Sequence, residues 1–106
     1  MDVNNIKDFK IGWFIGNFEP TLFKTKDFEI AHHLYPKGMK STPHTHKIAT
    51  EVNYIVRGSL IATGQQLRSG DMFTYYPNEI SEVEFLEDTD LIIIKFPSIP
   101  EDKYLV

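Results

Sequence analysis

Cysteine is absent from the 106 residues of the chain. Disulfide bonds, thiolate metal ligands and cysteine nucleophiles are therefore excluded. The chain also has no apolar run of the ~18 residues that a membrane-spanning helix needs, and its first residues lack the pattern of a signal peptide. We therefore expect a cytoplasmic protein without a membrane partner.

The excess of acidic over basic residues is also small. The chain has 15 Asp and Glu and 11 Lys and Arg, which gives a formal net charge of −4. Mild acidity disfavours a nucleic-acid partner, whose phosphates attract basic surfaces. Apolar residues make up 42% of the chain and aromatic residues 13%, which is typical of a folded globular protein. A chain of this length is expected to form one domain.

Helical periodicity is missing as well. No interval between the glycines and prolines carries a helical apolar period longer than two turns. The intervals are short and rich in β-branched and aromatic residues, which predicts an all-β sandwich or barrel. The expected strands are Ile11–Asn17, Thr21–Thr25, Phe28–Tyr35, Glu51–Arg57, Leu60–Thr63, Met72–Tyr76, Ser81–Phe85 and Asp90–Phe96.

The charges that are present are distributed unevenly. The stretch from Ile30 to Arg68 contains a single carboxylate, Glu51, together with all four histidines. It also contains five basic residues, which are Lys37, Lys40, Lys47, Arg57 and Arg68. This local excess of positive charge favours a small anionic ligand. The acidic run Glu79–Asp90 is interpreted as a solvated face with a hairpin turn.

Two of the histidines, His44 and His46, are separated by one residue. On a strand they point to the same face, and Pro43 marks the start of that strand. Glu51 opens the next β-like run, so two imidazoles and one carboxylate can meet on adjacent strands. Such a set makes a three-ligand metal site with open coordination positions. The alternative for an isolated His-x-His is a pair on the surface.

The spacing around these residues is specific. Gly38, His44, His46, Glu51 and Gly58 match every fixed position of Gly-x5-His-x-His-x3–4-Glu-x6-Gly. This pattern resembles the first conserved motif of the cupin superfamily. The resemblance implies a cupin-type double-stranded β-helix, a jelly-roll barrel of the RmlC-like kind, with a metal site inside one mouth.

The resemblance also implies the organisation of the chain. We expect a single cupin domain over 1–106, with N-terminal edge strands over 1–27, the barrel core over 28–96 and a C-terminal tail over 97–106. Small cupins commonly pair their sheets, so a homodimer is expected.

The second cupin motif, Gly-x5-Pro-x-Gly-x2-His-x3-Asn, is matched poorly. Its first glycine falls on Gly70, and a strict count places Ser81 where the usual histidine, the fourth ligand, would stand. A slip of one residue would place Glu82 there as a carboxylate ligand. That slip would turn Val83 and Phe85 away from the core, so we expect Ser81 to face inward.

The expected metal ligands are therefore His44, His46 and Glu51. Two histidines and one carboxylate suit Fe(II) and also accommodate Mn, Ni, Co or Zn. The missing fourth ligand leaves weak or absent metal binding as the alternative.

The candidate for proton transfer in a catalytic site is His32. It shares its predicted face with Phe28, Ile30 and Leu34, which indicates the inward side of the strand. A histidine that is satisfied in the core or at an edge is the alternative. His33 lies on the other face and is expected to be exposed.

Four polar side chains are predicted to bind substrate, and they are Asn53, Tyr76, Ser81 and Arg57. Asn53 alternates with Glu51 and should face the barrel. The alternative is that Asn53 holds Glu51 in place. Tyr75 is the alternative to Tyr76.

Two main functions follow from this combination. The first is a metal-dependent enzyme, of isomerase, epimerase, lyase or dioxygenase type, on a small polar or anionic substrate. The resemblance to small cupins points to a carbohydrate-derived substrate. The second is a non-catalytic cupin that binds or senses a small molecule or a metal. A third is an accessory protein with a vestigial motif, which predicts no stoichiometric metal.

Overall fold

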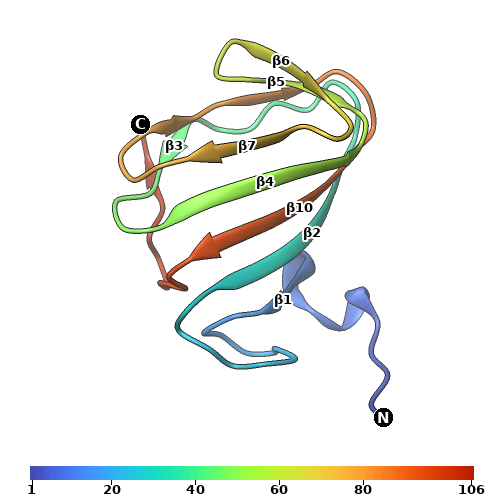
Figure 1. The fold of residues 1–106 in the computed structure, drawn as a ribbon, viewed down its shortest axis with the longest axis vertical. Helices are drawn as coiled ribbons and strands as arrows, with labels where there is room; N and C mark the ends of the chain where they lie inside the picture. Colours follow the sequence, from blue (N-terminus) through green and yellow to red (C-terminus); the bar gives the residue numbers. More distant parts are fainter.

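The computed structural model describes all 106 residues and is built almost entirely from antiparallel strands (Figure 1). The strands are β1 (Trp13–Ile15), β2 (Glu29–Tyr35), β3 (His44–Thr45), β4 (Thr50–Arg57), β5 (Ser59–Ala62), β6 (Gln65–Arg68), β7 (Met72–Tyr75), β8 (Ile80–Ser81), β9 (Val83–Phe85), β10 (Thr89–Phe96) and β11 (Tyr104–Leu105). Two short 3-10 turns, η1 (Ile6–Asp8) and η2 (Lys10–Gly12), precede them. No helix is long and apolar enough to cross a membrane.

The strands form three sheets. A five-stranded sheet has the order β1-β2-β10-β4-β7, and β2, β10 and β4 run side by side through the middle of the molecule (Figure 1). The two smaller sheets have the orders β11-β3-β8 and β6-β5-β9. An isolated antiparallel bridge joins Lys40 to Glu84 of β9.

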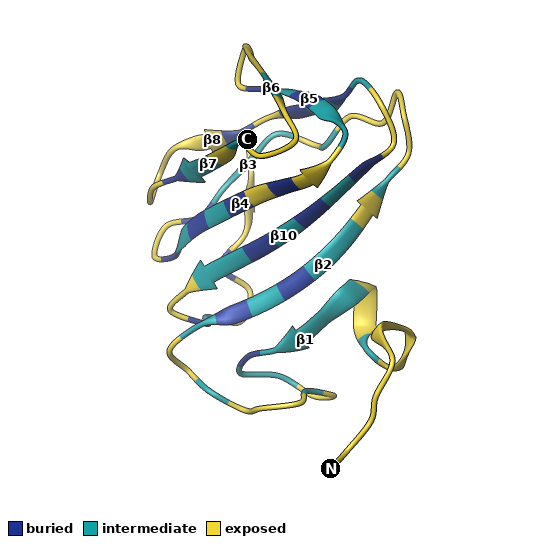
Figure 2. Ribbon diagram, turned by 45° about the vertical axis from the view of Figure 1, so that its right-hand side comes forward, coloured by how far each residue is buried: buried dark blue, intermediate teal, exposed yellow.

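The apolar core lies between these sheets because the strands alternate inward and outward residues. Along β10, Thr89, Leu91 and Ile93 are buried, while the alternate residues Asp90, Ile92 and Ile94 are half-buried (Figure 2). Leu91 and Ile93 pack with buried residues of β4, β5 and β9, which are Ile55, Leu60, Ala62, Val83 and Phe85. Four of these core residues, Val83, Phe85, Leu91 and Ile93, also line the cavity described below.

The last motif glycine, Gly58, sits in the tight turn between β4 and β5. Its φ of 107° is a conformation that residues with a side chain rarely adopt. A Cβ atom there would lie 2.6 Å from the carbonyl oxygen of Asp88. The motif therefore requires glycine at this place for a local steric reason.

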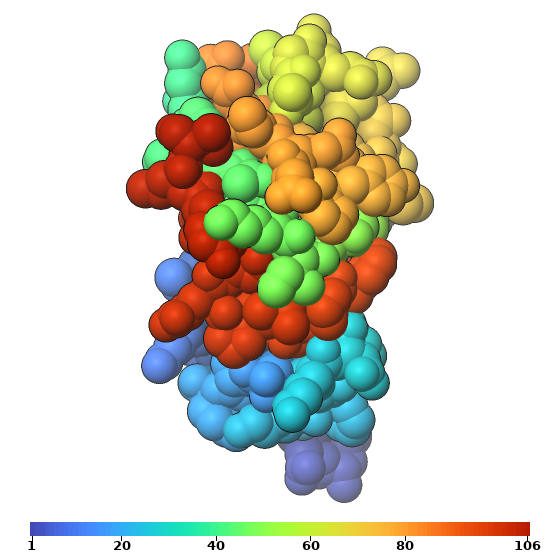
Figure 3. All heavy atoms as spheres, turned by 90° about the vertical axis from the view of Figure 1, so that its left-hand side faces the viewer, coloured from blue at the N-terminus to red at the C-terminus, as the bar shows by residue number.

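Most of the expected strands are present, with bounds that shift by a few residues. Thr21–Thr25 forms no strand, although Leu22 donates a backbone hydrogen bond of 2.8 Å to Phe14, and Phe23 and Thr25 form backbone hydrogen bonds of 3.3 and 3.4 Å with Gly16. Among residues 1–27, β1 alone is a strand at the edge of the sheet. The C-terminal tail contains β11, which pairs with β3 and lies against the middle of the chain (Figure 3). Gln65–Arg68, not expected as a strand, completes a hairpin with β5.

Candidate functional site

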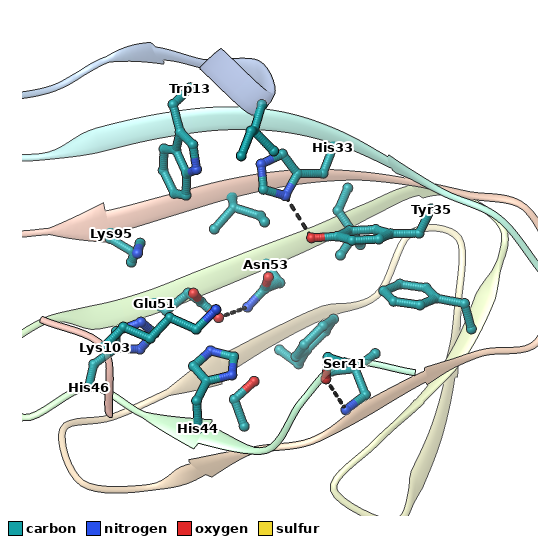
Figure 4. Close-up of a pocket in the computed structure, with 17 residues that line it drawn as sticks. Trp13, His33, Tyr35, Ser41, His44, His46, Glu51, Asn53, Lys95 and Lys103 are labelled. Atoms are coloured by element: carbon teal, nitrogen blue, oxygen red, sulfur yellow. Dashed lines mark hydrogen bonds between the residues drawn. The ribbon is translucent and has the colours of Figure 1, made fainter. Parts of the chain in front are cut away.

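A cavity of about 340 Å³ opens between the five-stranded sheet and the sheet that contains β3 (Figure 4). Its polar lining side chains are His33, Tyr35, Ser41, His44, His46, Glu51, Asn53, Ser81, Lys95 and Lys103. We call it the inner cavity. The three predicted metal ligands all line it, and so do two of the four predicted substrate-binding residues.

His44 and His46 reach the inner cavity from β3 and the residue that follows it. Their rings stand edge to face, with centroids 5.2 Å apart. The Nδ1 atom of His44 lies 2.9 Å from the carbonyl oxygen of Thr42, which can only accept a hydrogen bond. The ring proton therefore sits on Nδ1 and leaves the lone pair on Nε2 free.

Glu51 and Asn53 enter the cavity from β4, where alternation places both on the inward face. The Nδ2 atom of Asn53 donates a hydrogen bond of 3.1 Å to Oε2 of Glu51 (Figure 4). Asn53 therefore orients the carboxylate, as one of the two sequence interpretations requires. Its role toward a substrate stays a prediction.

The environment of the cavity favours the neutral form of the His46 imidazole. Burial is the main cause that lowers the pKa of His46, and the nearby positive charge of Lys95 lowers it further. A neutral imidazole is the form that binds a metal ion. The donor types and the free Nε2 of His44 therefore fit a divalent metal. No group of three or more His, Asp or Glu side chains is close enough to hold an ion as they stand, so binding requires side-chain rotation.

The expected facing of His32 is wrong. His32 lies outside the inner cavity, and His33 of the same strand lines it instead. The apolar Ile30 and Leu34 favour the inward side for the strand face that they share with His32, yet Leu34 is 67% exposed. The inner face of β2 is set by Tyr35, whose ring stacks on Phe85 with centroids 4.2 Å apart.

His33 and Tyr35 form a hydrogen-bonded pair inside the cavity. The Nδ1 atom of His33 lies 2.6 Å from the hydroxyl oxygen of Tyr35 (Figure 4). Burial lowers the pKa of His33 and raises the pKa of Tyr35 to about 12, with the charge of Glu51 adding to the second shift. At neutral pH the imidazole is therefore uncharged and the phenol keeps its proton. His33 and Tyr35 are two residues apart in the sequence and therefore share one strand face. The expectation that this face is exposed kept the pair from being predicted.

Two predicted substrate-binding residues lie outside the inner cavity. Tyr76 is 61% exposed, and Arg57 is exposed with its guanidinium 3.2 Å from the carboxylate of Asp90. Tyr75, the alternative, is buried and bonds to the hydroxyl of Thr63 at 2.7 Å. It also does not line this cavity.

Ser81 faces the inner cavity as predicted and is buried, whereas Glu82 is exposed. The paired residue of Ser81 across the sheet is His44. Val83 and Phe85 are buried in the core, so the strict count of the second motif holds. Ser81 therefore presents a hydroxyl to the inner cavity.

The basic residues at the cavity are different from those that the sequence pointed to. None of the five bases between Ile30 and Arg68 lines it, but Lys95 and Lys103 do. Lys95 lies on β10, on the same face as Leu91 and Ile93. Its Nζ lies 3.4 Å from Oε1 of Glu29. Lys103 comes from the C-terminal tail beside β11.

The C-terminal tail is fastened to the turn that separates the two histidines from Glu51. The buried carboxylate of Asp102 accepts three backbone hydrogen bonds of 2.9–3.1 Å, from Lys47, Ile48 and Ala49. These bonds lower the pKa of Asp102 against the opposing effect of burial. The tail therefore holds the segment between His46 and Glu51 in place.

Solved structures with the same fold include proteins of several kinds. KdgF from Halomonas sp. superposes with a TM-score of 0.67 at 24% identity, covering 73% of this chain and 74% of that one. An uncharacterized conserved protein with a double-stranded β-helix domain from Klebsiella pneumoniae subsp. pneumoniae gives 0.70 at 16% identity, covering 77% and 72%. The DMSP lyase DddQ from Ruegeria pomeroyi gives 0.74 at 16% identity, covering 89% of this chain and 49% of that one.

No protein-family model and no curated protein sequence matches the chain. The structural likeness is nevertheless consistent over most of the chain, and it agrees with the antiparallel topology. The chain therefore has the cupin-type double-stranded β-helix fold that its first motif predicts.

Proposed function

We propose that the protein is a metal-dependent enzyme that acts on a small anionic substrate in the inner cavity. The observation that carries the proposal is that His44, His46 and Glu51 line one cavity, with the Nε2 lone pair of His44 free. These three side chains are the proposed ligands of a divalent transition metal, which is Fe, Mn, Ni, Co or Zn. When bound, the metal supplies Lewis-acid activation of an oxygen atom of the substrate.

The side chains around the ligands have separate proposed roles. Asn53 holds the Glu51 carboxylate in one orientation, which keeps its second oxygen available. The pair of His33 and Tyr35 replaces His32 as the group that moves a proton, because it lies in the cavity and its imidazole is uncharged at neutral pH. Ser81 offers a hydroxyl to a polar substrate atom.

Two proteins with the same fold favour the proposal of a metal and an anionic substrate. Oxalate decarboxylase from Bacillus subtilis has Mn(II) centres, and its structure matches this chain with a TM-score of 0.65 at 14% identity. A salicylate 1,2-dioxygenase variant from Pseudoaminobacter salicylatoxidans was solved in complex with gentisate, and it matches with a TM-score of 0.60. Oxalate and gentisate are carboxylates. The reaction type proposed for this chain is isomerisation, epimerisation, lyase or dioxygenase chemistry.

Metal analysis of untagged protein tests the ligand assignment. Wild-type protein is expected to hold a first-row transition metal, and His44→Ala and Glu51→Ala to lose most of it. His32→Ala is the matched control, because His32 lies outside the inner cavity. Wild-type metal content in His44→Ala and Glu51→Ala would show that the ligands are assigned wrongly.

A non-catalytic binding protein is the second candidate. It is favoured by the hydroxyl of Ser81 at the place of the usual fourth ligand and by the need for side-chain rotation before a metal binds. A turnover screen with sugar phosphates, sugar acids and 2-oxo acids separates the two functions. Turnover that His33→Gln or Tyr35→Phe reduces supports the enzyme, while binding without any turnover supports the second candidate.

A further inference from the structure

A second cavity, of about 250 Å³, lies next to the inner cavity. We call it the outer cavity. It shares Trp13, Lys95 and Lys103 with the inner cavity, so these three residues stand at the boundary between them. Figure 4 shows Lys95 and Lys103 on the side of the inner cavity where Glu51 and His46 lie. Any molecule that extends from the inner to the outer cavity must pass the two lysines.

The two ammonium groups outnumber the acids of the inner cavity. Glu51 is its only carboxylate, and that carboxylate already accepts a hydrogen bond from Asn53. The histidines add no negative charge in any protonation state. A divalent metal on the proposed ligands would increase the positive charge further. The outer cavity differs, because Glu19, Glu29, Glu101 and Asp102 line it beside Lys10, Lys95 and Lys103. The side of the boundary that faces the inner cavity is therefore the one that attracts an anion.

Lys103 has no partner of its own. The four ion pairs of the structure involve Lys24, Lys40, Arg57 and Lys95 but not Lys103. Lys95 has one partner, Glu29, and its Nζ lies 4.8 Å from the ring centroid of Trp13. The side chain of Lys95 is only 17% exposed, so little water compensates its charge.

The backbone of Lys103 is held on both sides. Asp102 accepts three hydrogen bonds from the 47–49 turn, and Tyr104 pairs with Thr45 of β3. A lysine on such a fixed segment loses little backbone freedom when it binds a ligand. Lys103 is an exposed residue that also lines the inner cavity, so its unpaired ammonium group is available to a ligand there.

We propose that Lys95 and Lys103 bind the anionic group of the substrate, a carboxylate or a phosphate, at the boundary between the two cavities. The uncharged remainder of the substrate then reaches toward His44, His46 and Glu51, where it would react. This inference deepens the proposed function and rests on it for the place of the reaction. Lys103 is therefore assigned a part in specificity, and the C-terminal tail becomes part of the site.

Trp13 provides a direct readout, because it is the only tryptophan of the chain and contacts Lys95. Its fluorescence would be followed while D-glucuronate, D-glucose 6-phosphate or neutral D-glucose is added. One of the two anions, or both, is expected to change the signal with saturation, and glucose is not. Comparison of the two anions tells which anionic group the site prefers. The titrations would be repeated after treatment with a chelator.

Lys103→Gln is the decisive variant, because Lys103 forms no ion pair and no carboxylate would lose its partner. It is expected to weaken binding of the anion about tenfold, the worth of one charge-assisted hydrogen bond. Lys40→Gln is the matched control, since Lys40 lines neither cavity and its side chain is 72% exposed. Lys95→Gln should weaken binding as well, and its circular dichroism would be checked because Glu29 loses its partner.

The inference would be overturned by equal binding of glucose, by no saturable effect of either anion, or by wild-type affinity in Lys103→Gln. An equal loss in Lys40→Gln would also overturn it, since the effect would then come from net charge alone. Anion binding through Lys103 in a protein that never holds a metal would support this inference while contradicting the proposed function. The two proposals therefore fail in different ways.

Discussion

The Oδ2 atom of Asp102 accepts a hydrogen bond of 2.9 Å from the backbone N–H of Ala49, a residue 53 positions earlier in the chain. Both residues are buried. The contact joins the C-terminal tail to the turn between the His-x-His strand and β4. The integrity of the candidate site therefore depends on a residue outside both sequence motifs.

Asp102→Ala is expected to lower the free energy of unfolding by about 2 kcal/mol, because three hydrogen bonds to a charged group are lost and the N–H group of the buried Ala49 loses its acceptor. Urea unfolding measures the change. Asp27→Ala serves as control, since no hydrogen bond or ion pair of the Asp27 side chain is found in the structure. An equal effect of the two substitutions would show that Asp102 does not fasten the tail.

The same carboxylate predicts a loss of stability in acid. The pKa of Asp102 is lowered in the folded state from its ordinary value of 3.8. A lowered folded pKa stabilises the protein above pH ~4, and this contribution is lost as the pH falls through the folded value. Asp102→Asn should therefore show a flatter decline of stability below pH ~4 than wild type. Parallel declines in the two proteins would contradict the assignment.

Tyr35 predicts a loss of stability in alkali. Its pKa is raised from 10.0 to about 12, so folding favours the protonated phenol. The stabilisation is full below pH 10.0 and is lost as the pH rises toward about 12. Tyr35→Phe should therefore decline less steeply over this range than wild type. Chemical unfolding at a series of alkaline pH values measures it, and identical slopes would argue against a buried, protonated Tyr35.

The two motif glycines should differ in their tolerance of a side chain. Both have positive φ, 107° at Gly58 and 87° at Gly38, so alanine is strained by about 1–2 kcal/mol at each. Only at Gly58 would the added Cβ atom also clash with backbone, at Asp88. Thermal unfolding of Gly58→Ala and Gly38→Ala compares them. Equal melting temperatures would show that the turn at Gly58 adapts.

Sequence periodicity determined a large part of the site. Residues two apart share a strand face, and this placed His44 with His46 and Glu51 with Asn53. The same rule chose Ser81 over Glu82, because the apolar Val83 and Phe85 gain free energy by facing the core. It also contained the inward position of Lys95, which follows Leu91 and Ile93 at steps of two.

The facing of His32 and His33 was decided only by the tertiary structure. Both faces of β2 carry apolar or aromatic residues, so burial by itself did not choose between them. The stacking of Tyr35 on Phe85 selected the inner face. His32 lines a separate cavity together with Ile6, Lys7 and Phe9 of the N-terminal segment. The direction in which these side chains point therefore depends on Phe85, a stacking partner that is distant in the chain.

The place of Lys103 was likewise beyond the reach of local rules. Nothing in the neighbouring residues connects the tail to β3, because that pairing spans most of the chain and needs the completed barrel as its support. Local alternation thus determined which side chains of a strand travel together. The packing of distant segments, through stacking, strand pairing and the Asp102 carboxylate, decided which of those sets meet around the cavity.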